Sequence, residues 1–166
     1  MLSKMATAAT VVVMTVLTPF AGAAQNALRD GAGKAIATKA CALGSMKAKT
    51  ATKFVTTMST EYENVPGTGI KFKQGAGSGC VILQFSSEAS TNDSLILRAV
   101  LDGGAFIAAP SEVLFARGPS TLTAHAYNFV FVDVPAGPHT AIVQWRVDAG
   151  TFGNVARRST IVQYAP

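Results

Sequence analysis

The sequence predicts an all-β protein, an antiparallel β-sandwich or jelly roll, and three observations support this fold class. From residue 53 onward apolar and polar residues alternate, which is the period of half-buried strands. Short apolar segments follow one another along this region, separated by turns rich in glycine and proline. No segment has the length and periodicity of a long helix, so the crossover helices that a parallel sheet needs are missing.

Eight segments are predicted to be strands. They are Val55–Glu61, Ile70–Lys73, Cys80–Ser86, Ser94–Leu101, Glu112–Ala116, Ala124–Val134, His139–Val147 and Val155–Tyr164. The alternation is clearest in His139–Val147, where Trp145 is expected to face the core while Gln144 and Arg146 face outward. After Ser94–Leu101, the run Asp102-Gly103-Gly104 supplies the positive-φ residues that a tight turn needs.

The segment Ala124–Val134 differs from the others because both of its faces are apolar. Tyr127, Phe129 and Phe131 lie on one side, and Ala126, Val130 and Val132 lie on the other. Such a strand is either central, with cover on both faces, or part of a subunit interface. The turn Val134–Pro138 predicts that this segment pairs with the next strand as a hairpin.

The C-terminal part of the chain resembles a known family. Residues 129–146 (FVFVDVPAGPHTAIVQWR) place a Val-Pro-x-Gly-x-His-Thr turn between two apolar strands. This pattern resembles the last hairpin of secreted jelly-roll domains, and C1q/TNF-like heads show a similar strand, turn and strand. The resemblance as a whole covers about 40 residues at the C-terminus. No collagen-like repeat precedes it. The resemblance implies an exported recognition or structural module, compatible with a trimer, and it carries over no catalytic residue.

The N-terminus has the order of a secretory signal peptide. Lys4 precedes an apolar stretch over residues 5–20, and the small residues Ala21-Gly22-Ala23-Ala24 follow. The apolar stretch is shorter than the roughly 20 residues that cross a bilayer, and no later segment is long enough, so no transmembrane segment is expected. We therefore predict a signal peptide over residues 1–24, and a secreted protein, extracellular or periplasmic.

A basic segment follows the signal peptide. Residues 25–53 hold six basic residues and one acidic residue, a net charge of +5. Residues 54–166 hold seven basic and eight acidic residues, a net charge of −1. We predict a flexible basic leader over residues 25–52 and the sandwich domain over residues 53–166. The leader, from Arg29 to Lys53, could attach to an anionic surface. It contains no aromatic residue before Phe54, which argues against nucleic acid as a partner.

The two cysteines, Cys41 and Cys80, are predicted to form a structural disulfide. An even pair in an exported chain favours this pairing. A metal site is not expected, because the chain has no C-x-x-C motif and no histidine near either cysteine.

No catalytic residue and no cofactor are predicted. The glycine-rich run Gly75–Gly79 places Ser78 one position late for a nucleophile elbow. His125 and His139 are expected to lie far apart on their strands, too distant for a shared metal. Glu61 and Glu63 could share one strand face, as a glycosidase pair would, but an ordinary solvated strand end explains them.

These observations favour an exported, non-enzymatic recognition or assembly module. Its partner is an unknown extracellular molecule or glycan, or a second copy of the chain. In the second case a homo-oligomer would form through Ala124–Val134, the aromatic strand. The candidate binding residues are Gln144 and Arg146, which face outward, and Tyr127 on the aromatic strand. The alternative is an extracellular carbohydrate-binding module or a small hydrolase.

Overall fold

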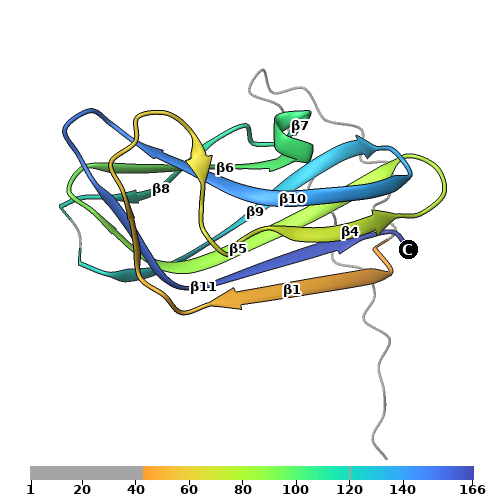
Figure 1. Cartoon of the computed structure of the whole chain (residues 1–166), viewed down its shortest axis with the longest axis horizontal. Coiled ribbons are helices and arrows are strands. Elements are labelled where there is room, and N and C mark those ends of the chain that lie inside the picture. The colour runs from red at the N-terminus through yellow and green to blue at the C-terminus, as the bar shows by residue number, and fades with distance from the viewer. Residues whose placement is uncertain (1–42, 120) are drawn as a thin grey trace, which may run out of the picture.

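The structure is a computed structural model that describes residues 43–119 and 121–166. These residues form two antiparallel sheets packed face to face (Figure 1). The described residues contain one short 3₁₀ turn, η1 (Asp102–Gly104), and no α-helix. The predicted β-sandwich is therefore confirmed. Within these ranges no helix has the length and hydropathy to span a bilayer. The predicted signal peptide lies outside the described residues.

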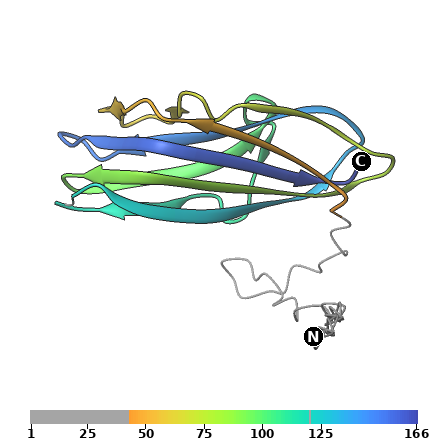
Figure 2. The same cartoon turned by 90° about the horizontal axis from the view of Figure 1, so that it is seen from below.

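The first sheet has four strands side by side, which Figure 2 shows face-on. In spatial order they are β1 (Ser45–Ala51), β11 (Gly153–Tyr164), β5 (Gly79–Thr91) and β9 (Thr123–Val134), and β2 (Val55–Thr57) also pairs with β11.

The second sheet is centred on β10 (Gly137–Val147) and β6 (Ser94–Leu101), which pair with each other. On the outer side of β10 lie β3 (Glu63–Asn64) and β4 (Ile70–Gln74), and on the outer side of β6 lie β7 (Phe106–Ile107) and β8 (Val113–Arg117).

The strand order has the topology of a jelly roll. When the eight strands β1, β4, β5, β6, β8, β9, β10 and β11 are numbered in chain order, the sheets read 1-8-3-6 and 2-7-4-5. Most successive connections therefore cross from one sheet to the other, as in the two interlocked Greek keys of this fold.

The core lies between the sheets and is built from alternate side chains, as the sequence predicts. Trp145, Phe85, Phe129 and Phe131 are its largest buried members. The inward residues of Ser94–Leu101 and His139–Val147 are buried, and the residues between them are half-buried on the outside, except for Val100, which is also buried. The positive φ angles at Asp102, Gly103 and Gly104 are also as predicted.

The predicted boundary between leader and sandwich at residue 53 is wrong. Residues 45–51, placed in the flexible leader, form β1, which pairs with β11 along its whole length from Ser45↔Tyr164 to Ala51↔Arg158. The alternation is hidden in the sequence because β1 is an edge strand whose side chains are mostly exposed. Tertiary pairing with β11 therefore decides its conformation, not local apolar periodicity.

The predicted hairpin between Ala124–Val134 and His139–Val147 is also wrong. β9 pairs with β5 in the first sheet, and β10 lies in the second, where His139 is opposite Phe72 of β4. Asp133 (φ 53°) and Gly137 (φ 135°) turn the chain out of the first sheet, so the following strand enters the other layer. β9 is an edge strand, so the central position allowed by its sequence is excluded.

The predicted strand Val55–Glu61 is likewise divided. Its first part, β2, pairs with β11, and the chain then bends across to β3, which pairs with β10. Val55–Glu61 therefore passes from one sheet toward the other and is not a single strand.

Candidate functional site

The predicted binding residues separate into two places. Gln144 and Arg146 project from β10 on the outer face of the second sheet, and both are half-buried. Tyr127 lies on β9 at the open edge of the first sheet, 39% exposed, with its ring centroid 5.2 Å from that of Phe129. Tyr127 therefore belongs to a different surface from Gln144 and Arg146.

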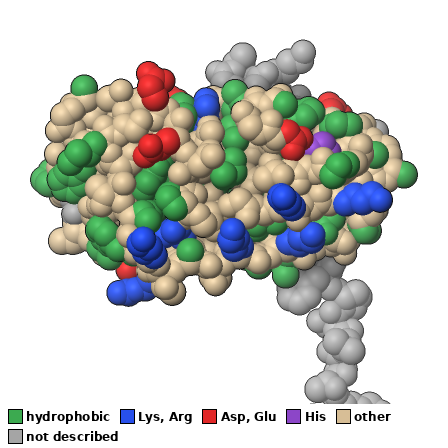
Figure 3. Space-filling view, viewed as in Figure 1, with side chains coloured by type: hydrophobic (Ala, Val, Ile, Leu, Met, Phe, Trp, Pro, Cys, Tyr) green, Lys and Arg blue, Asp and Glu red, His purple; other side chains and the backbone are tan. Residues whose placement is uncertain are grey.

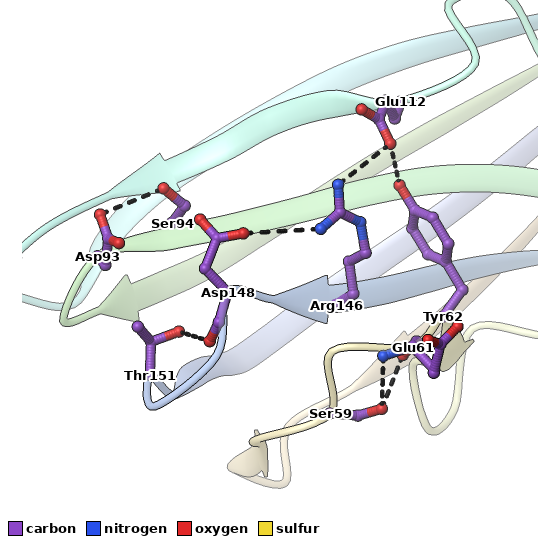
Figure 4. Close-up of polar contacts among 9 residues, drawn as sticks. All are labelled: Ser59, Glu61, Tyr62, Asp93, Ser94, Glu112, Arg146, Asp148 and Thr151. Atoms are coloured by element: carbon purple, nitrogen blue, oxygen red, sulfur yellow. Dashed lines mark hydrogen bonds and ion pairs between the residues drawn. The ribbon is translucent and has the colours of Figure 1, made fainter.

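Around Arg146 the structure assembles a polar cluster whose centre, Tyr62, the sequence did not single out. The Arg98 guanidinium carbon lies 3.8 Å from the centroid of the Tyr62 ring, and that of Arg146 lies 5.4 Å from it. The Tyr62 hydroxyl donates a hydrogen bond to Glu112 Oε2 at 2.5 Å (Figure 4). Two cations thus lie against one ring, an arrangement that the ring quadrupole stabilises.

Two carboxylates balance the charge of Arg146. Its guanidinium lies 3.6 Å from Glu112 Oε2 and 3.7 Å from Asp148 Oδ1. Figure 4 shows that these partners approach it from opposite sides, Glu112 from the segment before β8 and Asp148 from the end of β10. The cluster therefore ties a loop and two strands together across the outer face.

Gln144 joins the same face through a row of side chains. Arg98 Nε donates to Gln144 Oε1 at 2.8 Å, and Gln144 Nε2 donates to Asn64 Oδ1 at 2.9 Å. The strand register explains this row, because Gln144 is directly opposite both Arg98 on β6 and Asn64 on β3. Both ends of its amide are already engaged within the sheet.

The electrostatics of the cluster suit binding and packing better than proton transfer. Burial and the hydrogen bond to Glu112 raise the pKa of Tyr62 above its usual range. The hydrogen bond from Tyr62 and the charge of Arg146 hold the pKa of Glu112 below its usual range. A general acid or base works best with a pKa near the working pH, but the pKa values of Tyr62 and Glu112 are both shifted away from neutral pH.

His139 forms a second polar contact, at the end of the sandwich where β9 leads into β10. Its Nδ1 lies 2.6 Å from Asp102 Oδ2 and its Nε2 lies 2.9 Å from the Pro135 carbonyl oxygen. The side chain is buried and its ring is 5.6 Å from that of Phe72. His139 therefore joins the turn after β6 to the connection between the two sheets.

This contact shifts the pKa of both partners. Burial alone would lower the pKa of His139, but the hydrogen bonds to Asp102 and Pro135 outweigh it and the pKa is raised. For Asp102, partial burial opposes the shift, but His139 and the Thr140 amide lower its pKa. No group of three or more metal-ligating side chains gathers within residues 43–119 and 121–166.

Cys80 is buried near the start of β5 and is not a free cysteine. Its predicted partner, Cys41, lies outside the described residues, so the Cys41–Cys80 disulfide stays a prediction.

The outer face of the first sheet carries a surface of a different kind. Strand register aligns side chains in three rows across β1, β11, β5 and β9. The rows are Met46, Gln163, Ile82 and Val130; Ala48, Ile161, Gln84 and Asn128; Thr50, Ser159, Ser86 and Ala126. All twelve are half-buried or exposed and none is charged. We call these twelve residues the neutral face.

Comparison with known proteins does not assign this chain to a family. The sequence matches no protein-family model, and no curated protein is significantly similar to it.

Sequence reasoning missed both the Tyr62 cluster and the neutral face for the same reason. Tyr62, Arg98 and Glu112 are far apart in the chain and share no motif; only the folded sheet brings them together. The sequence does show that the outward residues of some predicted strands are uncharged. The strand order that aligns them could not be read in this way.

Proposed function

We propose that this protein is an exported, non-enzymatic assembly module whose copies associate through the neutral face. The observation that carries the proposal is the absence of charge from all twelve side chains of this face. Protein interfaces are depleted of charged residues at their centre, whereas ordinary solvated surfaces are not. An exported chain that associates in this way fits the signal peptide that the sequence predicts.

The distribution of charge favours a second copy of this chain as the occupant. The described residues hold ten basic and eight acidic side chains, and all of them lie off the neutral face. Contacts through the lysines of β1 and β4 would bring like charges of two copies together. At the margin of the neutral face Arg157 pairs with Glu88 at 2.7 Å, which cancels the nearest charges. Two copies therefore meet with least repulsion when their neutral faces are in contact.

The size of the first sheet suits this role. β11, β5 and β9 are 12, 13 and 12 residues long. At about 3.3 Å per residue and about 4.8 Å per strand, the twelve positions of the neutral face cover roughly 380 Å². A standard interface buries about 800 Å² on each partner. The neutral face therefore forms the centre of the proposed contact, and the ends of β11, β5 and β9 supply the rest of its area.

The β9 edge extends this surface. Val130 exchanges both of its backbone hydrogen bonds with Ala109 on the side away from β5, at 2.8 and 2.9 Å. Residues of the same parity, Ala124, Ala126 and Asn128, therefore direct their backbone groups to that side, where the described residues offer no backbone partner. From Thr123 to Val132 this edge has no Lys, Pro or acidic residue to prevent pairing with another chain.

The test is the mass of the assembly in solution. Light scattering of the purified chain should report a multiple of the monomer mass. Ser86→Lys places a charge on the neutral face and should shift the protein toward monomer, because a buried unpaired ammonium is costly. Ser94→Lys, an outward residue of β6 on the second sheet, is the matched control and should keep the wild-type mass. A monomeric wild type would reject the proposal, as would equal masses for the two variants.

The alternative function, a glycan-binding module or small hydrolase built around Gln144 and Arg146, has less support. Gln144 uses both ends of its amide within the sheet, and Arg146 is held by Glu112 and Asp148. A ligand there would have to displace contacts that are already satisfied.

A further inference from the structure

We propose that one edge of the sandwich, formed by β1 and β4, binds an acidic polysaccharide. The residues of this basic edge are Lys47, Lys49, Lys53, Lys71 and Lys73, together with the buried Arg158. On β1 the lysines of this edge point to the opposite side of the strand from Met46, Ala48 and Thr50 of the neutral face, so this inference does not depend on the proposed function.

The two strands bring the lysines together from distant parts of the chain. Lys47 Nζ donates to the Lys71 carbonyl oxygen at 2.9 Å, and Lys49 Nζ donates to the Gly69 carbonyl oxygen at 3.2 Å. These contacts bridge the gap between the two sheets, so the ammonium groups of β1 lie beside β4. All five lysines are exposed. Figure 3 shows the result as a row of blue side chains over β1 and β4.

No carboxylate neutralises this row among residues 43–119 and 121–166. None of the four ion pairs in these ranges involves a lysine. Neither residues 43–60 nor residues 64–87 contain Asp or Glu. The positive potential of the edge is therefore left for a ligand or for solvent ions.

Arg158 contributes a buried positive charge to the basic edge. Its side chain is only 4% exposed, and its Nε and Nη1 donate to the carbonyl oxygens of Pro66 and Lys53, both at 2.6 Å. It has no carboxylate partner among the described residues. A buried guanidinium held only by carbonyl groups strengthens the attraction of this end of the edge for an anion.

The shape of the row favours a linear polymer. Lysines two residues apart on one strand are separated by about 6.7 Å, and the row from Lys47 to Lys53 spans about 20 Å. An acidic polysaccharide is an extended chain with anionic groups at regular intervals, which successive lysines can contact. A membrane would need a planar array of cations with inserted apolar side chains, but beside the row from Lys47 to Lys53 the large exposed apolar side chains are Met46 and Phe54, one at each end.

Single-stranded nucleic acid fits less well. Its binders combine cations with exposed rings on which bases stack. At this edge Phe72 of β4 is only 3% exposed, and Phe54, which follows Lys53, is a single exposed ring and not a series on which successive bases could stack.

The experiment measures binding of the full-length chain to polygalacturonate and to heparin, with uncharged dextran as the control polymer. We expect binding to at least one acidic polymer that weakens as salt is added, and none to dextran. Lys71→Gln combined with Lys73→Gln should weaken binding about tenfold at low salt, because two ionic contacts are lost. Neither ammonium group takes part in a hydrogen bond of the fold, so this variant should fold normally.

Arg117→Gln combined with Arg157→Gln removes the same charge from exposed positions elsewhere and should change binding less than about twofold. Both variants keep the predicted leader, so its lysines contribute equally to each. Equal loss in the two variants would overturn the proposal, as would tighter binding to single-stranded DNA or to phosphatidylserine vesicles than to either polysaccharide. Light scattering on the same samples separates this result from the assembly proposal, because the Lys71/Lys73 variant should keep the wild-type mass.

Discussion

The outer faces of the two sheets differ in the charged side chains that they carry. The first sheet exposes twelve uncharged side chains at the centre of its outer face, and Arg158 of β11 is buried. The second sheet displays Arg98 and Arg146 on its outer face and balances them with Tyr62 and nearby carboxylates. Both sheets have the same alternating pattern, so the fold does not impose this difference.

On the proposed function, the outer face of the second sheet contacts water and the neutral face contacts another copy. Polar groups on the second sheet satisfy one another, and they remain partly exposed without cost. The first sheet offers apolar side chains that gain from being covered and uncharged polar side chains that can be covered once they are hydrogen-bonded.

Removing the interior cation of the first sheet should cost most. Arg158→Ala loses the hydrogen bonds to Lys53 and Pro66 and leaves a cavity, so we expect the free energy of unfolding to fall by about 3 kcal/mol. Arg157→Ala, one residue away, removes only an exposed ion pair with Glu88 and should cost less than about 0.5 kcal/mol. Urea denaturation measures both. Similar losses for the two variants would contradict the interior role of Arg158.

The contact between His139 and Asp102 should make stability depend on pH. The raised pKa of His139 means that its contribution is complete below about pH 6.5 and is lost as the pH rises through the raised value. The lowered pKa of Asp102 means that its contribution is lost as the pH falls below about 3.8. Stability from this pair is therefore greatest between these limits and should fall by roughly 1 kcal/mol on the alkaline side.

Thermal unfolding followed from pH 5 to pH 9 tests this dependence. His139→Gln should flatten the decline above pH 6.5, because it removes the titrating ring that pairs with Asp102. If the decline persisted unchanged in His139→Gln, another group would be responsible for it.

The smallest effect is expected on the exposed cluster of the second sheet. Tyr62→Phe removes the hydroxyl bonded to Glu112 but keeps the ring beneath Arg98, so the loss should be under about 1 kcal/mol. Tyr62→Ala removes the ring as well and should cost more. Equal losses for the two variants, measured by urea denaturation, would show that the stacking of the arginines contributes nothing.

The sequence allowed the elements to be predicted better than their partners. Ser94–Leu101 was predicted with its observed bounds, and the inward residues of His139–Val147 were correct, because period-two burial is a local signal. β1 was missed because an edge strand with exposed lysines has no such signal. The β9–β10 hairpin was wrong because positive φ angles at Asp133 and Gly137, which no local pattern specified, send the chain into the other sheet.

The candidate sites depended on this missing information. Gln144 and Arg146 were predicted to face outward together, and they do, because both lie on one strand. Tyr127 was grouped with them only by residue type, and it lies on the other sheet. The neutral face and the basic edge needed the strand order, since each takes its residues from segments that are distant in the chain.

Association through the neutral face can be tested directly by observing which face of the sandwich contacts another copy. Isotope-filtered NOE spectroscopy on a mixture of labelled and unlabelled chains detects only contacts between copies. We expect intermolecular NOEs from the methyl groups of Ile82, Val130 and Ile161 on the neutral face. The absence of such NOEs, or NOEs confined to Ile96 and Leu114 of the second sheet, would contradict the claim.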